Sequence, residues 1–336
     1  MFDGKQVLVT GGTGMIGKYL VERLIERGAR VTVASIDPPA LCDPRARFVH
    51  ANLMDIRNCL EVCRGQEFVF HLAGIKGSPA VTTTRPASFF VPTILFNTNM
   101  MEAARQCGVQ RYLFTSTIGV YAPAEVFYED EVWKRFPSEH DRIGSWAKRM
   151  GELQAEAYAI EYGWKEICIV RPANVYGRYD NFDPVNAMVV PSLIRRAVEG
   201  ENPMVVWGDG SAVRDFIHAR DVADGMLFVM KNEIYQPVNL GSGRGVSIKN
   251  LVEAIVACLD APPEVQWDTT KPTGDKMRIM DMSRLAGRGF APKVSLEEGV
   301  RDTIEWFRRQ RSAPMGRYNV FTQGVNFETH QASSAA

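Results

Sequence analysis

Three spaced glycines near the start of the chain constrain its fold more than any other feature. Gly11, Gly14 and Gly17, in the run VLVTGGTGMIG, lie between a predicted strand at 6–11 and a predicted helix at 17–28. Glycines at this spacing allow a tight turn, a close approach of the backbone to a phosphate, and close helix packing. The glycines alone are a weak signal, but here strand, turn, helix and a following strand occur in order. The pattern therefore predicts a dinucleotide-binding βαβ unit.

The first half of the chain alternates β-branched runs with amphipathic segments, which is typical of βα units on a parallel sheet. Strands are expected at 6–11, 29–35, 46–53, 67–74, 110–117 and 165–177, and helices at 17–28, 97–108 and 145–163. After residue 177 the rhythm changes, and a strand, a turn and a second strand are expected over 204–218. We expect an α/β fold: a Rossmann-type doubly wound parallel sheet with a smaller C-terminal α/β lobe for the substrate. The expected division is 1–176 with the return of 217–245, then 177–216 with 246–312, and a tail at 313–336.

The residues after the second predicted strand select between NAD and NADP. A carboxylate there binds the ribose hydroxyls, whereas a basic residue binds the 2′-phosphate of NADP. The sequence offers Ser35, Ile36 and Asp37, with no basic residue directly after the strand. It favours NAD, with Asp37 or Ser35 at the ribose, and leaves NADP possible. The expected cofactor contacts are Gly11, Gly14, Met15, Ile16, Gly17, Ser35, Asp37, Asn52, Leu53, Leu72, Ala73 and Lys148.

Charge and composition exclude several classes of partner. Lysine plus arginine equals aspartate plus glutamate at 39 each, so no net field draws the chain to nucleic acid. The N-terminus lacks a charged segment followed by an apolar one, and no apolar run approaches the length of a membrane span. The six cysteines lack CxxC pairs and nearby histidines, which indicates reduced thiols and no metal site. We expect a cytoplasmic protein with neither a nucleic-acid nor a membrane partner.

Several motifs together resemble the extended short-chain dehydrogenase/reductase family, also described as the NAD-dependent epimerase/dehydratase family. In order they are TGGTGMIG, HLAG, FTSTIGVY, Lys148, RPANVYG and RDFIHARD, and the match extends to about residue 310. The second half is most similar in plan to the GDP-fucose synthase branch. The resemblance implies an enzyme that acts on a nucleotide sugar. It also implies a homodimer paired through the helices at 97–108 and 145–163.

The same resemblance implies a set of substrate-binding residues. They are Asn174, Arg196, Trp207, Arg214 and Lys271. Asn174 and Arg214 would contact the substrate pyrophosphate, because an amide and a planar guanidinium suit phosphate oxygens. Two of these residues have an alternative interpretation. Arg196 is equally compatible with a solvated position on a helix, and Trp207 with a position in the hydrophobic core.

Three positions depart from the family pattern. In GDP-fucose synthases a cysteine and a histidine shuffle protons at C3 and C5, and Gly119 and Met188 stand at these positions here. Neither side chain can exchange a proton, so 3,5-epimerisation by that route is not expected. The family's tyrosine, four residues before the lysine, is replaced by Gly144. That tyrosine takes up the sugar hydroxyl proton while hydride moves to the nicotinamide, and the lysine lowers its pKa.

The missing tyrosine leaves three interpretations open. In the first, the protein is a working oxidoreductase in which Thr117 relays the proton or a neutral Lys148 accepts it. Tyr128 and Asp141, on the loop before the helix, are further candidates. In the second, the protein binds its ligands and has lost the chemistry. In the third, Gly144 replaces an original tyrosine. The first is favoured because the other expected site residues remain.

We therefore expect oxidoreduction or epimerisation at C4 of a nucleotide-activated sugar, preferably a GDP-linked hexose or heptose. A 4-dehydrogenase, a 4-keto reductase and a 4-epimerase all fit, since none of them needs proton exchange at C3 or C5. The expected catalytic residues are Thr117 and Lys148. The alternatives are a catalytically impaired dinucleotide- or sugar-nucleotide-binding protein and a UDP-sugar 4-epimerase.

Overall fold

A seven-stranded parallel sheet forms the centre of the structure, a computed structural model that describes residues 1–139, 141–271, 274–310 and 316–324. The strand order is β11-β7-β5-β4-β1-β2-β3. The strands are β1 (Gln6–Thr10), β2 (Arg30–Ser35), β3 (Arg47–His50), β4 (Phe68–His71), β5 (Arg111–Thr115), β7 (Ile167–Pro172) and β11 (Val238–Leu240). Because neighbouring strands are parallel, their carboxyl ends meet at one edge. The expected Rossmann-type α/β sheet is confirmed.

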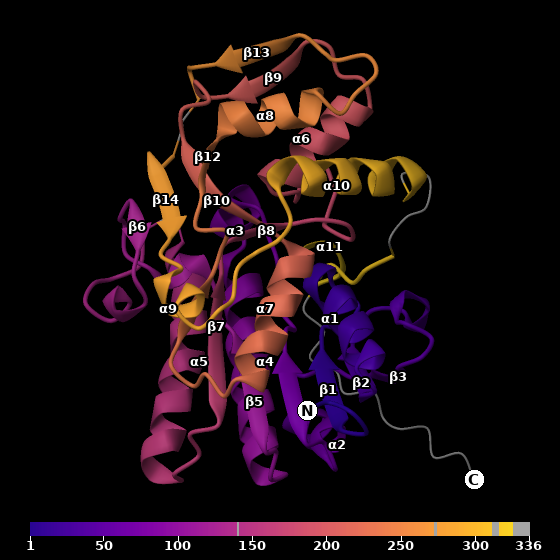
Figure 1. The fold of residues 1–336 in the computed structure, drawn as a ribbon, viewed down its shortest axis with the longest axis vertical. Coiled ribbons are helices and arrows are strands. Elements are labelled where there is room, and N and C mark those ends of the chain that lie inside the picture. Colours follow the sequence, from indigo (N-terminus) through magenta and orange to yellow (C-terminus); the bar gives the residue numbers. More distant parts are fainter. Residues whose placement is uncertain (140, 272–273, 311–315, 325–336) are drawn as a thin grey trace.

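Helices cover both faces of this sheet (Figure 1). They are α1 (Met15–Glu26), α2 (Ile56–Cys63), α4 (Pro86–Gln106), α5 (Arg142–Glu161) and α7 (Ala219–Lys231). The short helix α3 (Pro79–Thr84) packs against α4. In β1, Val7 and Val9 belong to the buried cluster formed with α1 and α7. Leu8 belongs to the opposite cluster, formed with α2 and α4. Successive side chains of a strand point to opposite faces, so the apolar run VLV fills both layers of the core.

The C-terminal half adds a smaller lobe, which lies above the large sheet in Figure 1. One of its sheets has the order β12-β10-β14-β6, with β8 also paired to β10, and a second sheet pairs β13 with β9. These strands are β6 (Val126–Phe127), β8 (Asn174–Tyr176), β9 (Met204–Trp207), β10 (Val213–His218), β12 (Gly245–Ser247), β13 (Val265–Asp268) and β14 (Met277–Met280). The remaining helices are α6 (Val189–Val198), α8 (Ile248–Val256), α9 (Ser283–Ala286), α10 (Leu296–Gln310) and α11 (Val320–Gln323), with 3-10 turns at Pro39–Leu41, Ile118–Val120 and Glu129–Glu131.

Two elements differ from the sequence expectations. Helix α4 begins at Pro86 rather than near residue 97, with Pro92 inside it. An interior proline removes a backbone N–H and is unfavourable in a helix, so the sequence did not predict a helix through this position. The single strand expected at 165–177 is divided into β7 and β8, which belong to different sheets. The two strands expected over 204–218 are present as β9 and β10. No helix in the described part of the chain combines the length and the apolarity needed to cross a bilayer.

Candidate active site

A cleft of about 1840 Å³ lies at the carboxyl edge of the large sheet. Residues that follow β1, β2, β4, β5 and β7 line it, together with residues 180–191 from the smaller lobe. Pockets for single ligands usually enclose about 300–1,000 Å³, so this cleft has room for a dinucleotide and a second ligand. Parallel α/β sheets bind their ligands at this edge.

The glycine-rich turn shapes one end of the cleft. Gly11 has a φ of +67°, and a Cβ atom on it would lie 2.9 Å from the Cα of Ala73, so the turn requires glycine. A Cβ on Gly17 would collide with the carbonyl oxygen of Gly11. Gly14 is the N-cap of α1 and supplies no side-chain cap, which leaves the first N–H groups of the helix open to an anion. All the residues expected to contact the cofactor line this cleft.

Asp37 lies at the end of the cleft where the cofactor ribose is expected. Its side chain is buried, and its Oδ2 accepts a hydrogen bond from the Thr13 hydroxyl at 2.6 Å. The Ser35 hydroxyl lies 3.0 Å from that of Thr13. Oδ1 of Asp37 accepts the backbone N–H of Tyr318 at 2.9 Å. Each carboxylate oxygen has a second lone pair, so the group retains capacity for ribose hydroxyls.

Lys148, on α5, lies at the other end of the cleft. Its Nζ donates to the carbonyl oxygen of Thr115 at 2.8 Å. Burial lowers the pKa of Lys148 to about 8, although the charge of Glu152, one turn along the helix, opposes this shift. The Thr117 hydroxyl accepts the N–H of Gly119 at 3.3 Å, so its own O–H remains available as a donor. The structure therefore brings both expected catalytic residues to one cleft.

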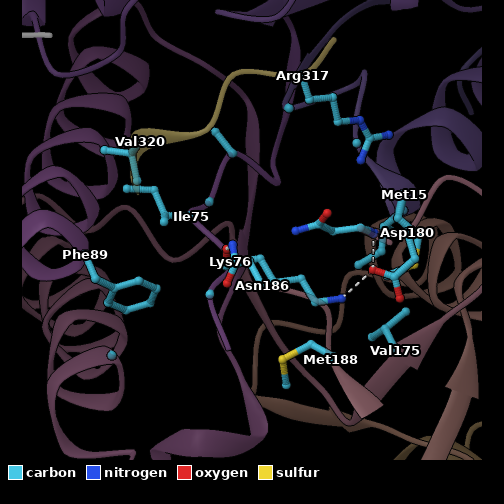
Figure 2. Close-up of a pocket in the computed structure, with 18 of the residues that line it drawn as sticks. Met15, Ile75, Lys76, Phe89, Val175, Asp180, Asn186, Met188, Arg317 and Val320 are labelled. Atoms are coloured by element: carbon cyan, nitrogen blue, oxygen red, sulfur yellow. Dashed lines mark hydrogen bonds and ion pairs between the residues drawn. The ribbon is translucent and has the colours of Figure 1, made fainter. Parts of the chain in front are cut away.

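An aromatic ring lies against Gly144, the position at which the family resemblance predicts a tyrosine. A Cβ atom built on Gly144 would lie 2.8 Å from Cε1 of Phe89, closer than real Cβ contacts allow. Phe89 belongs to α4, and Figure 2 shows its ring on the side of the cleft opposite Asp180. The glycine and the phenylalanine are therefore matched, since a larger residue at 144 requires the ring to move.

The other candidate proton acceptors are less suitable. Asp141 lines the cleft, and its carboxylate accepts a hydrogen bond from Arg278 at 2.8 Å. Tyr128 is 53% exposed and does not belong to the lining. The Ser145 hydroxyl donates to the backbone carbonyls of Asp141 and Gly119, so its proton is already engaged.

An ion pair crosses the middle of the cleft. Nζ of Lys76 lies 2.7 Å from Oδ1 of Asp180, a dashed line in Figure 2. The side chain of Asp180 is only 2% exposed, and its Oδ2 has no hydrogen-bond partner among the described residues. Asn186 accepts the N–H of Ser78 at 2.6 Å and donates to the Lys76 carbonyl oxygen at 3.2 Å. These contacts tie the loop after β4 to the smaller lobe.

The residues expected to bind the substrate are dispersed. Asn174 lines the cleft, and its amide donates to the Asp215 carbonyl oxygen at 2.9 Å. The other four do not belong to the lining. Arg214 donates to the carbonyl oxygen of Asp275 at 2.7 Å, and Arg196 is paired with Glu201. Trp207 is 67% exposed, and Nζ of Lys271 lies 5.8 Å from its ring centroid. Their substrate contacts stay predictions.

Sequence reasoning left many residues of the cleft unidentified, and four of them contact residues of the candidate site. They are Phe89, Asp180, Arg317 and Tyr318. Asp180 stands in the run DNF at 180–182, between the motifs RPANVYG and RDFIHARD that carry the family resemblance, and this place offered a signal. Phe89 lies in the part of α4 that the helical pattern did not reach. Arg317 and Tyr318 belong to the predicted tail, where no local pattern points to the cleft.

Comparisons with known proteins agree with this geometry. Residues 7–241 match the family model of the NAD dependent epimerase/dehydratase family. GDP-L-fucose synthase 1 of Arabidopsis thaliana is 32% identical over 314 residues, which cover 90% of this chain and 93% of the relative. A dTDP-4-dehydro-6-deoxy-D-allose reductase of Streptomyces bikiniensis is 29% identical over 318 residues, which cover 91% of this chain and 97% of the relative.

The solved structures agree as well. The UDP-glucose 4-epimerase of Thermotoga maritima, determined with UDP-glucose, matches with a TM-score of 0.78 and 29% identity, covering 91% of this chain and 99% of that chain. The family resemblance and the fold expected from the sequence are confirmed. The chain belongs to the NAD dependent epimerase/dehydratase family.

Proposed function

We propose that this protein uses NAD to oxidise, reduce or epimerise C4 of a nucleotide-activated sugar. The relatives' names support this class of function, since they include a sugar-nucleotide synthase, a 4-keto-sugar reductase and a 4-epimerase. The observation that carries the proposal is Lys148, whose pKa is lowered to about 8 in the cleft that also contains the complete glycine turn.

Lys148 accepts the proton of the C4 hydroxyl in this proposal. NAD, held by the glycine-rich turn and Asp37, would supply the hydride acceptor for C4 and, in an epimerase, the hydride donor. With a pKa of about 8, roughly one Lys148 in ten is neutral at pH 7, and the neutral amine is a base. The proton moves to Nζ directly or through the Thr117 hydroxyl as the C4–O bond becomes a carbonyl. In the reductive direction Lys148 returns the proton.

The Phe89 ring supports this role of Lys148. It lies against Gly144 and gives that part of the cleft wall an apolar surface. An apolar wall disfavours the charged form of a lysine, so it keeps the pKa low. Gly119 and Met188 also line the cleft and carry no exchangeable proton, which restricts the proposed chemistry to C4.

The finer parts of the proposal concern the ligands and the assembly. Asp37 favours NAD over NADP, because its carboxylate suits a ribose hydroxyl and repels a 2′-phosphate. The similarity to GDP-L-fucose synthase 1 favours a GDP-linked hexose or heptose, with a UDP-sugar as the alternative. We also propose a homodimer through α4 and α5, since Leu153 and Ile160 of α5 are 44% and 78% exposed.

We further propose that the chain divides into the two expected lobes, a cofactor lobe and a smaller substrate lobe, and that the protein is cytoplasmic.

The second candidate is a protein that binds both ligands without chemistry. The Phe89 ring beside Gly144 supports it, because the ring takes up the space that a side chain at position 144 would need. This candidate predicts bound cofactor whose redox state never changes.

The test begins with the nucleotides that the purified protein releases on denaturation, identified by mass spectrometry. NAD or NADH together with a sugar nucleotide supports the enzyme and names its substrate class. Turnover of that sugar nucleotide is then compared for Lys148→Met, Lys148→Arg and Thr117→Val. Arginine keeps the positive charge and cannot become neutral, so both Lys148 variants should lose turnover by about 10²–10⁴-fold. Unchanged turnover in all three variants overturns the proposed proton transfer.

A further inference from the structure

We propose that the C-terminal segment at 316–324 forms part of the cofactor site, and that Arg317 binds a phosphate group of the dinucleotide. The inference rests on the proposed use of a dinucleotide and adds a ligand from the far end of the chain. Arg317, Tyr318 and the next three residues line the same cleft as the glycine-rich turn.

Apolar contacts hold this segment in place. Val320 and Phe321, at the start of α11, are 5% and 9% exposed. The guanidinium of Arg85 lies 5.9 Å from the Phe321 ring and donates to the Phe321 carbonyl oxygen. A Cβ on Gly77 would lie 3.0 Å from that ring, so the loop after β4 lies close against it. These packing contacts fix the position of the segment, and none of them involves Arg317.

The side chain of Arg317 extends from this segment toward the glycine-rich turn. Its Nη2 donates to the carbonyl oxygen of Thr13 at 2.8 Å. Its Nε is buried and has no hydrogen-bond partner among the described residues. Figure 2 shows the side chain on the side of the cleft where Met15, the first residue of α1, lies. A phosphate at the N-terminus of α1 would lie beside this guanidinium and would accept its unpaired N–H.

The local charges favour an anion at this point. Burial lowers the pKa of Lys18, in the first turn of α1, and the charge of Arg317 lowers it further. Burial also lowers the pKa of Arg317, while Asp37 and Asp180 oppose the shift. Both side chains are half-buried, and an anion beside them would reduce the repulsion between the two positive charges. The two carboxylates offset part of this charge, and Asp37 is already bonded to Thr13 and Tyr318.

The test compares affinities for NAD, NADP and ADP-ribose, measured by calorimetric titration at low and high salt. The variants are Arg317→Gln, Arg317→Lys and Phe321→Ala in the full chain, with the exposed Arg309→Gln as the matched control. Loss of a charge-assisted hydrogen bond should weaken NAD and ADP-ribose binding about 10- to 100-fold in Arg317→Gln. Lysine should recover part of the loss. Phe321→Ala removes packing contacts that fix the segment, so it should also weaken the binding of NAD and ADP-ribose.

The salt dependence separates a phosphate contact from a structural role. Salt weakens the attraction between exposed charges, so NAD binding should depend less on salt in Arg317→Gln than in the parent. Equal losses for NAD and NADP place the contact at the pyrophosphate, whereas a larger loss for NADP places it at the 2′-phosphate. Unchanged or tighter NAD binding in Arg317→Gln overturns the inference, as does a loss with unchanged salt dependence. If either result is obtained while the parent protein binds NAD, the inference about Arg317 fails and the proposed function is not affected.

Discussion

Placing a tyrosine at position 144, where the family resemblance predicts one, should require the removal of Phe89. A Cβ on Gly144 would lie 2.8 Å from Cε1 of Phe89, 0.6 Å short of an ordinary 3.4 Å contact, before any phenol ring is added. Overpacking of this kind costs about 1–3 kcal/mol, and replacing a helical glycine by tyrosine returns about 0.5 kcal/mol. Gly144→Tyr alone should therefore lower the free energy of unfolding by about 0.5–2.5 kcal/mol.

The double variant Gly144→Tyr/Phe89→Ala should recover stability, because the new ring fills the space that Phe89 leaves. It should also increase turnover about tenfold or more, since a general acid–base group is worth about 10²–10⁴ in rate. The assays are urea denaturation and NADH formation at 340 nm with the sugar nucleotide that the protein releases. Gly144→Phe/Phe89→Ala is the control, because it has the same shape without the phenol hydroxyl.

Two results would refute this reasoning. If Gly144→Tyr alone is as stable as the parent, Phe89 does not occupy the tyrosine position. If the tyrosine and phenylalanine double variants turn over equally, the absent phenol does not limit the chemistry.

Three further predictions concern charges. Oxidative turnover should rise with pH through about 8, because deprotonation of Lys148 creates the base, and Lys148→Arg should abolish the rise in a pH–rate profile. Asp37→Asn should raise the ratio of NADP to NAD affinity about tenfold, equal to about 1.4 kcal/mol of removed repulsion, in competition titrations. Arg171→Met should lower the free energy of unfolding by about 3–5 kcal/mol in urea, because it leaves Glu152, 2.7 Å away and 2% exposed, without its partner. Arg171→Met/Glu152→Leu should recover most of that loss, and an equal loss in both would contradict a role for the pair.

The sequence revealed those features that depend on neighbouring residues. The glycine turn and β1 were predictable, since Gly11, Gly14 and Gly17 lie within one strand–turn–helix unit. Lys148 and Thr117 were predictable by their spacing within the family motifs. Both line the cleft because the strands are parallel and their carboxyl ends coincide.

The features that escaped prediction depend on distant contacts. Phe89 meets Gly144 across 55 residues of sequence, and no periodicity links α4 to that position. Strand β9 pairs with β13, some 60 residues downstream, and the local pattern gave no indication of this partner. The contact of Arg317 with Thr13 spans 304 residues. Packing between elements decides such contacts, and a single sequence carries no local record of them.

The most direct test of the central claim follows one hydrogen atom. The protein is incubated with NAD and with GDP-, UDP- and dTDP-linked hexoses that carry deuterium at C4, and the cofactor and sugars are then analysed by mass spectrometry. The account predicts that deuterium moves from C4 to the nicotinamide for one class of sugar nucleotide, and that Lys148→Met abolishes the transfer. Sugar nucleotides that bind to the protein but keep all their deuterium would contradict an oxidoreductase and leave a ligand-binding protein.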